Sequence, residues 1–274
     1  MAAGFLKRRA KIRPGKPGVG LLSVLPFRED WSPWTEAPSM RSLWGWIRRY
    51  TLGIDHSGHS RCIQANIPME LSHILYKVND LRGAVSHFRE QGFHVEFGSK
   101  RRPTNALIYF SEGPYVELLE RAPVSALAKL LLRCIGKGAV ARRFEAWDNA
   151  DEGWFEICLE NHRDDFAEEV EVMKRHGEPH FITSSARTDP SGRRLTWRML
   201  FPLNNALPFL MTYFNVDPKP VAFVHPNGVI GIDRVQYRTQ SGFVSLLNAL
   251  CDDDVLSVQE GQGGIEVTYR TLPG

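Results

Sequence analysis

Two residues whose side chains suit proton transfer, His73 and Glu117, lie on predicted strands of the segment 71–120. Val116 and Leu118 flank the glutamate, and because side chains alternate along a strand, Glu117 is expected on the opposite face to theirs. The same alternation lets His73 face one side of its sheet. A glutamate whose pKa is raised by burial and a histidine can act as general base and general acid. We therefore expect the function to reside between these two side chains.

The elements that carry this pair form a short unit of strand, helix and three strands. A strand over 73–78 precedes a helix over 81–91, in which apolar residues recur at i, i+3, i+4 and i+7. Gly92 follows the helix, as a C-terminal glycine commonly does. The remaining strands of the unit are predicted at 93–97, 105–110 and 115–119.

The same order of elements returns twice, which indicates an internal repeat. The second copy has a strand at 154–159, a helix at 164–176 and strands near 181–186, 195–201 and 209–214. A third, partial copy has a strand at 232–237, a helix at 242–250 and strands at 255–259 and 265–269. Between the first two copies, we expect a linker helix over 124–135 and a loop over 141–153.

The first 68 residues are expected to form a loosely ordered, flexible leader. They hold four of the seven tryptophans and 11 Lys and Arg against 4 Asp and Glu, while Pro and Gly interrupt any periodicity. Met69, directly before the first clear strand, is an alternative start of translation. A basic, Trp-rich leader also allows a third, weaker function as an anchor to a membrane surface or a partner.

Several short motifs follow one another in a characteristic order. They are Ser-His at 72–73, Asn-Ala-Leu at 105–107, Tyr-Val-Glu at 115–117, Trp-Arg at 197–198, Pro-Phe-Leu at 208–210 and His-Pro-Asn-Gly at 225–228. In this order the chain resembles, over about 71–269, the vicinal oxygen chelate superfamily of glyoxalases, bleomycin resistance proteins and dioxygenases, and within it the glyoxalase-like domain proteins. The resemblance implies an α+β fold in which repeated βαβββ units form a curved mixed-sheet cup. The domain would span 69–274, with units at about 71–121, 154–214 and 230–270.

A divalent metal is implied by the resemblance, which carries His73 and Glu117 over as its ligands. Zn, Ni, Fe and Mn are the candidates, because a cation with open coordination positions can act as a Lewis acid. Thr104 stands where related sequences often carry a further histidine, and a threonine hydroxyl is a poor ligand for these metals. Leu210 stands near the position of a second carboxylate. Two alternative donors remain on the first strand of the second unit: Glu156 and Cys158.

Four further residues are candidates for a substrate pocket. Asn105 can orient a ligand oxygen or simply cap its strand. Trp197 can stack on a flat ligand and Arg198 can pair with a carboxylate or phosphate, but alternation allows only one of them to face the pocket. His225, in a loop, is either a ligand contact or a turn residue.

Two functions of different classes fit these residues. The first is a small-molecule enzyme of lyase, isomerase or dioxygenase type that acts on an oxygenated metabolite, with Glu117 as ligand or general base and His73 as ligand or acid. The alternative is a metal-free binding or resistance protein that holds a small molecule in the same cup. Superfamily cups often form within or between paired chains, so the resemblance also allows a homodimer.

Composition limits the cellular setting. The chain has 274 residues, 43% of them hydrophobic, and no apolar run long enough to span a membrane. Its four cysteines are scattered without metal-site or disulfide spacing, which favours a reducing cytoplasm. The net charge of +3 comes without any nucleic-acid-binding motif, so we expect no nucleic-acid partner.

Overall fold

The computed structural model describes residues 52–54, 60–62 and 68–272. The predicted leader therefore lies mostly outside the described residues. Within it, two short strands, β1 (Leu52–Ile54) and β2 (Ser60–Cys62), pair antiparallel.

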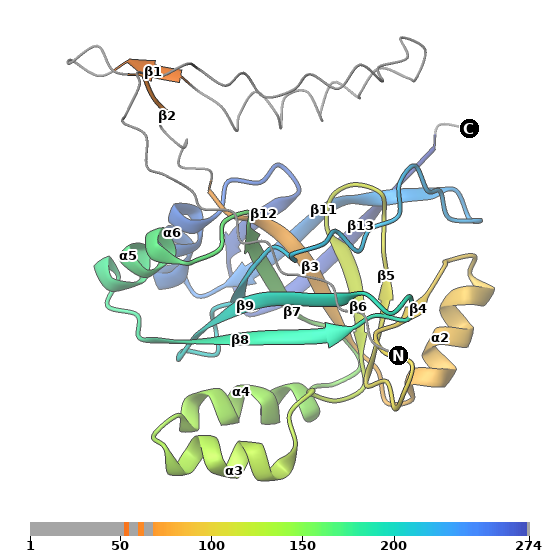
Figure 1. Cartoon of the computed structure of the whole chain (residues 1–274), viewed down its shortest axis with the longest axis horizontal. Coiled ribbons are helices and arrows are strands. Elements are labelled where there is room, and N and C mark those ends of the chain that lie inside the picture. Colours follow the sequence, from red (N-terminus) through yellow and green to blue (C-terminus); the bar gives the residue numbers. More distant parts are fainter. Residues whose placement is uncertain (1–51, 55–59, 63–67, 273–274) are drawn as a thin grey trace, which may run out of the picture. The chain divides into compact units, whose positions relative to one another are not determined.

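One mixed sheet of eight strands carries both of the first two predicted units (Figure 1). Its strands are β3 (Glu70–Lys77), β4 (Glu96–Phe97), β5 (Asn105–Ile108), β6 (Tyr115–Leu119), β7 (Gly153–Asn161), β8 (His180–Thr188), β9 (Arg194–Pro202) and β10 (Phe209–Thr212). They lie in the order β4-β5-β6-β3-β7-β10-β9-β8, so that each unit forms one half. The halves join where β3 and β7 pair antiparallel, and the sheet curls into a cup. The predicted α+β cup of βαβββ units is confirmed.

Local sequence signals explain the first unit. Helix α2 (Leu81–Glu90) starts after Asp80, whose side chain accepts a hydrogen bond from the backbone N–H of Arg82. It ends before Gly92, which adopts a φ of 84° that a residue with a side chain rarely takes. In the second unit, the order of elements is the same, and α5 (Ala167–Arg175) follows the strand β7.

Two helices connect the units, where the sequence predicted one helix and a loop. Helix α3 (Ala126–Cys134) matches the expected linker helix. The loop predicted over 141–153 is wrong, because α4 (Gly138–Asp148) occupies most of it. The two helices lie side by side below the cup in Figure 1.

Helix α4 packs because apolar side chains line one side of it. Val140, Phe144 and Trp147 are buried at helical spacing and join the core inside the cup. Arg143 lies between them and is only 1% exposed. Because this charged residue interrupts the apolar positions, the sequence pattern predicted a loop here instead of a helix.

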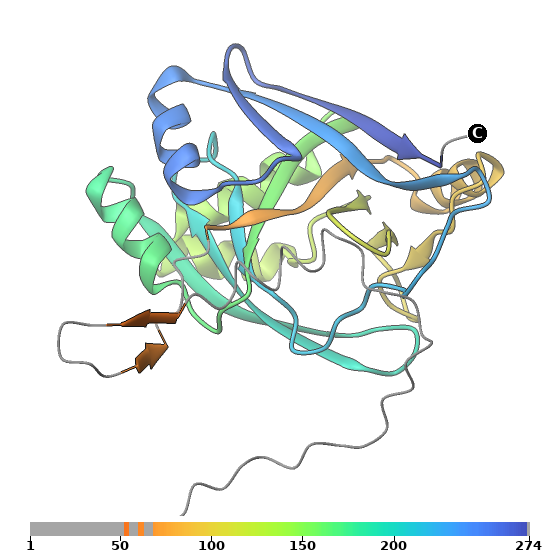
Figure 2. The same ribbon diagram turned by 90° about the horizontal axis from the view of Figure 1, so that it is seen from above.

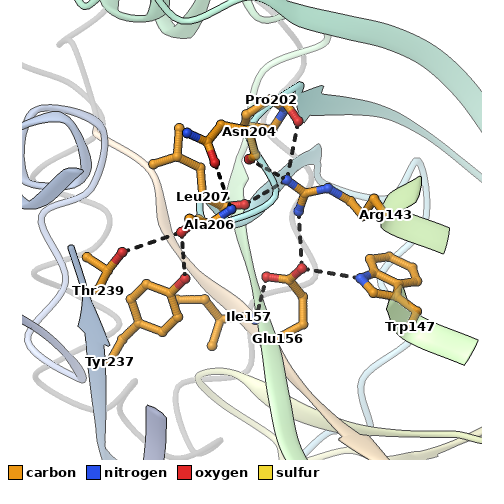
Figure 3. A network of polar contacts seen from close by, with 10 residues as sticks. All are labelled: Arg143, Trp147, Glu156, Ile157, Pro202, Asn204, Ala206, Leu207, Tyr237 and Thr239. Carbon is orange, nitrogen blue, oxygen red and sulfur yellow. Dashed lines mark hydrogen bonds and ion pairs between the residues drawn. The ribbon is translucent and has the colours of Figure 1, made fainter. Parts of the chain in front are cut away.

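Arg143 is held by a network that joins four parts of the chain (Figure 3). Its guanidinium donates to the Glu156 carboxylate at 3.1 Å and to the carbonyl of Leu207 at 2.8 Å. The Trp147 indole donates to the same carboxylate at 3.2 Å. Because a buried charge needs a partner, this network fixes α4 on β7 and on the turn between β9 and β10.

The third predicted copy forms a separate sheet beside the cup (Figure 1, Figure 2). Its elements are β11 (Val229–Thr239), α6 (Ser241–Leu250), β12 (Leu256–Glu260) and β13 (Gly264–Thr271). The strand order is β12-β11-β13, and none of the three pairs with a cup strand. Tyr237 of β11 donates a hydrogen bond to the carbonyl of Ala206 at 3.2 Å, which links this sheet to the same turn (Figure 3).

Alternation along the strands divides the core in two. Ile74 and Val116 face outward, into the cluster that contains α2, α5, α6 and the third copy. Leu75 faces inward, into the cluster that contains α4. His73 and Glu117 share this inward face of the sheet and line its cavity. Among the described residues, no helix is long and apolar enough to cross a membrane.

Candidate functional site

A cavity of about 620 Å³ lies between the inner face of the cup and the two linking helices. Its size is typical of a small-molecule site. Most of its lining is apolar, and aromatic rings from both α4 and the second unit are prominent: Phe144, Trp147, Trp197, Phe201, Phe209 and Phe214. Polar side chains come from both units: His73, Asn105 and Glu117 from the first, and Ser185 and Arg187 on β8 from the second.

A chain of polar contacts leads into this cavity. The Nε2 atom of His73 lies 3.4 Å from Oε2 of Glu117, and the Asn105 amide donates to Oε1 of Glu117 at 2.8 Å. On the other side of the ring, Nδ1 of His73 lies 2.9 Å from the Ser72 hydroxyl. That hydroxyl donates to the Glu160 carboxylate at 2.7 Å. Five polar residues thus connect across the centre of the sheet.

An irregularity in strand pairing places Ser72 in this chain. Along β3 and β7 the pairs run from Leu71 with Leu159 to His73 with Cys158, so that Ser72 is skipped. Such a bulge breaks the alternation of side chains and re-aims one of them. The serine hydroxyl consequently reaches the ring of the residue that follows it.

His73 is neutral at physiological pH. Burial, together with the positive charges of Arg187 and Lys219, lowers its pKa to about 3. The ring stacks on Tyr115 with centroids 4.7 Å apart, and the edge of Phe209 lies on its other side at 5.7 Å. An uncharged imidazole adds no positive charge beside Glu117, so it does not lower the pKa of that carboxyl group.

Glu117 has the opposite shift from the same cause. Burial raises the pKa of its carboxyl group, although the hydrogen bond from Asn105 and the charge of Arg187 act against this rise. A carboxyl group with a raised pKa is a stronger base than an exposed glutamate. This is the property that a proton acceptor needs near neutral pH.

Counting hydrogens assigns the tautomer of His73. The Ser72 hydroxyl has one hydrogen, and it goes to Glu160. Nδ1 of His73 must therefore donate to Ser72, which leaves Nε2 as an acceptor facing Glu117. Nε2 thus has no hydrogen to donate to the carboxylate 3.4 Å away, and Oε2 of Glu117 can take up a proton.

The donors around this pair do not form a complete metal site. No three His, Cys, Asp or Glu side chains come together anywhere in the described part of the chain. Glu156 is bound by Arg143 and Trp147, and burial keeps the Cys158 thiol protonated by raising its pKa. His73 and Glu117 remain as two donors, whereas catalytic zinc sites use three protein ligands. This donor set does not fit a tightly bound resident metal.

The structure separates the other predicted pocket residues into two groups. Asn105 and Trp197 line the cavity together with His73 and Glu117. Arg198 does not line it and instead borders a shallow pocket on the outside of the second unit.

His225 also lies outside the cavity. Its Nδ1 accepts a hydrogen bond from the backbone N–H of His94 at 2.9 Å, and its Nε2 donates to the carbonyl of Tyr109 at 3.0 Å. These two bonds tie its loop to the first unit, which is the turn role weighed above.

One cavity residue that the sequence interpretation missed is Arg187. It lies on β8, at the edge of the sheet, and donates to the carbonyl of Gly98 at 2.9 Å and to the Tyr109 hydroxyl at 2.7 Å. Gly98 and Tyr109 flank the strands at the opposite edge, so Arg187 bridges the two edges of the cup. The predicted strand ended at residue 186, one position too early to include it.

Comparisons with known proteins agree with this fold. The model of the family described as "Glyoxalase-like domain" matches residues 71–247, which is more than half of the chain. No curated protein sequence matches the chain.

The solved structures that the chain resembles are distant in sequence. A hypothetical protein from Staphylococcus aureus has a TM-score of 0.51 and 16% identity, over 71% of this chain and 87% of that one. Methylmalonyl-CoA epimerase from Streptomyces coelicolor has a TM-score of 0.34 and 17% identity, over 53% of this chain and 97% of that one. The epimerase from Mycobacterium tuberculosis gives 0.33 and 15%, over 58% and 97%. On the evidence of its family match and its cup, the chain belongs to the glyoxalase-like domain family, within the vicinal oxygen chelate superfamily.

Proposed function

We propose that the protein is a small-molecule enzyme in which Glu117 removes a proton from a carbon beside a carbonyl group. The observation that carries this proposal is the buried Glu117 carboxyl, aimed into a mainly apolar cavity beside the neutral ring of His73. The metabolite would be apolar and oxygenated. The reaction would be an isomerisation or a lyase reaction that starts from this proton transfer.

The step balances without any further reagent. The C–H bond breaks, its proton joins an oxygen of ionised Glu117, and the electron pair moves onto the carbonyl oxygen to form an enolate. The charges of Arg187 and Lys219 that lower the pKa of His73 also favour this negative charge. Asn105 holds the carboxylate in place, and protonated Glu117 can return the proton to another atom of the enolate.

Deuterium exchange tests this function without knowledge of the substrate. Aryl ketones and aryl 2-oxo acids are incubated with the protein in D₂O, and the loss of the proton beside the carbonyl is followed by proton NMR. The wild type should accelerate exchange of at least one compound, and Glu117→Gln should reduce that rate by roughly 10²- to 10⁴-fold.

Glu120→Gln is the matched control, because it removes a carboxylate just beyond the same strand that does not line the cavity. It should exchange as fast as the wild type. Exchange that is equally fast in Glu117→Gln, or that never exceeds the rate in buffer, would contradict the proposal.

A metal-free binding protein is the second candidate function. It is favoured by the aromatic, mainly apolar lining and by the pair of metal donors, His73 and Glu117, which the described residues do not extend to a third beside the cavity. Stoichiometric binding of compounds from the same panel, without exchange in any of them, would support it over the enzyme. For either function we propose a cytoplasmic protein, since the described cysteines, Cys134, Cys158 and Cys251, are all free thiols.

A further inference from the structure

We infer that Arg187 binds a carboxylate group of the ligand, so that the substrates are apolar, aromatic carboxylates. This inference deepens the proposed function and rests on it for the identity of the cavity as the reaction site. It replaces the role that the sequence suggested for Arg198, whose side chain lies outside the cavity.

The contacts of Arg187 do not neutralise its charge. Its two hydrogen-bond partners, the Gly98 carbonyl and the Tyr109 hydroxyl, are uncharged groups, and burial keeps that hydroxyl protonated by raising its pKa. No carboxylate of the described residues forms an ion pair with Arg187 within 4.0 Å. A guanidinium stays charged at any physiological pH. The cavity wall therefore contains an unpaired positive charge.

The guanidinium also has free donors. An arginine has five N–H groups, and the Gly98 and Tyr109 contacts use two, which leaves three. The planar fork of such donors matches the two oxygens of a carboxylate better than any other common organic group. An anionic ligand group that reached it would gain a charge-assisted bond in a largely apolar surrounding.

The surroundings define the rest of the ligand. The Phe214 ring lies 6.0 Å from the guanidinium carbon and lines the same cavity. Trp197, Phe209 and Trp147 extend the aromatic lining from there. Flat rings pack favourably against such a lining. A molecule with one carboxylate and an aromatic body thus fits both chemical surfaces of the cavity.

Other cations near the site are less suitable. Lys219 lies outside the cavity, and its ammonium group donates to the carbonyl of Gly113 at 2.9 Å. Arg198 lines the outer pocket and lies 3.4 Å from the carbonyl of Asp164. Among the described residues that line the cavity, Arg187 is the one arginine or lysine.

A pair of probes that differ in charge alone tests the inference. We would measure the dissociation constants of 2-naphthoate and 2-naphthamide for the full-length protein by isothermal titration calorimetry at pH 7. The wild type should bind the acid at least tenfold more tightly than the amide. Arg187→Gln should bind the acid no more tightly than the amide and should retain the wild-type affinity for the amide.

Two further variants keep the test decisive. Arg198→Gln is the matched control and should keep the wild-type preference for the acid. Because Arg187 also bridges the two edges of the sheet, Arg187→Lys is the second variant, which retains the charge but lacks the fork. It should keep the affinity for the amide and lose part of the preference for the acid.

Several results would overturn the inference. They are a wild type that binds the acid no better than the amide, a wild type that binds neither, a preference that survives in Arg187→Gln, and an undiminished preference in Arg187→Lys. The outcome is independent of the exchange assay. If the protein prefers the acid but catalyses no exchange, Arg187 is supported as a carboxylate-binding residue and the proposed enzyme activity is contradicted. If it catalyses exchange without preferring the acid, the enzyme activity is supported and the role of Arg187 is contradicted.

Discussion

Burial of His73 and Glu117 in one apolar cavity shifts their pKa values in opposite directions, because burial disfavours the charged form of each. The histidine becomes a poor base towards solvent, and the glutamate becomes a better one. Such divergence of neighbouring titratable groups is common where a site moves protons. The same shifts predict measurable effects that do not require a substrate.

His73 should make the protein less stable as the pH falls. Since its pKa is about 3 in the folded protein and 6.5 when exposed, the unfolded chain binds more protons between these values. The stability that neutral His73 supports is therefore present above pH 6.5 and is lost as the pH falls towards 3. The free energy of unfolding of the wild type, relative to His73→Gln, should fall by up to about 1.4 kcal/mol per pH unit below pH 6.

Urea denaturation of both proteins at pH 7, 6 and 5 measures this difference. Glu117 is present in both, which limits its contribution to the difference. His87→Gln, at an exposed position of α2, is the matched control. A difference between wild type and His73→Gln that stays constant from pH 7 to pH 5 would show that His73 is not buried in its neutral form.

Gly98 should be required for the position of Asn105. A methyl group on Gly98 would lie 2.1 Å from Oδ1 and 2.8 Å from Cγ of Asn105, which is closer than atoms can approach. In Gly98→Ala the amide should rotate away from Glu117, breaking the 2.8 Å hydrogen bond, at a cost of about 1–3 kcal/mol in stability.

A crystal structure of Gly98→Ala, with its urea denaturation curve, checks this expectation. Gly242→Ala is the control, because a methyl group there meets nothing within 4 Å. An unchanged Asn105–Glu117 hydrogen bond in Gly98→Ala would show that the loop adapts instead.

At the residue level, the sequence predicted the positions of His73, Glu117, Asn105 and Trp197 because alternation along a strand is a local property. It did not predict Arg187, because the predicted strand ended at residue 186. In the structure, β8 continues to Thr188 and so includes Arg187, whose side chain lines the cavity. It also missed Ser72 as a partner of His73. Ser72 reaches the His73 ring because of a bulge, which depends on pairing with a strand about 90 residues away. The local sequence therefore does not predict it.

At the level of elements, α4 determines how the cup is closed. Its buried Arg143 is compatible with the core only because the Glu156 carboxylate and three backbone carbonyls receive its hydrogen bonds. Burial raises the pKa of Glu156, while the charge of Arg143 lowers it. Sequence periodicity treats an arginine as a surface residue, so it could not identify this helix.

Removal of Arg143 should be strongly destabilising. Arg143→Met leaves Glu156 as a buried carboxyl group without its cation, which typically costs about 3–5 kcal/mol. The double variant Arg143→Met, Glu156→Gln should regain much of this loss, because the buried charge is then absent and the amide oxygen can still accept from Trp147. Urea denaturation gives the free energies.

Arg142→Met is the matched control, since Arg142 is the exposed neighbour on the same helix, and it should change stability by about 0.5 kcal/mol or less. If Arg143→Met proved as stable as Arg142→Met, the network of Figure 3 would not hold the helix in solution.

At the scale of the whole molecule, the repeated order of elements predicted the cup, because each βαβββ unit forms a contiguous half of the sheet. The third copy also repeats the pattern, yet it forms its own sheet and packs against the outer core. A repeated sequence pattern specifies the helices and strands of each copy. Which strands then pair depends on which sheet edges are available to them. In the cup, β4 and β8 are the edge strands, and Arg187 bridges between their sides.

This arrangement has one consequence for function. The outer face of the sheet is covered by helices and by the third copy, while the inner face keeps a cavity of about 620 Å³. Chemistry is therefore concentrated on inward-facing side chains, and Glu117 is the carboxylate among those that line this cavity. Glu117 can act as the proton acceptor only if its carboxyl group has the raised pKa of a buried base.

Carbon-13 NMR of protein labelled at the glutamate carboxyl carbon measures that property directly. The Glu117 resonance is assigned by its loss in Glu117→Gln, and its chemical shift is followed as the pH is raised. We expect a midpoint clearly above that of an exposed glutamate, because burial disfavours the carboxylate. A midpoint at or below the value of an exposed glutamate would contradict the assignment of Glu117 as the proton acceptor.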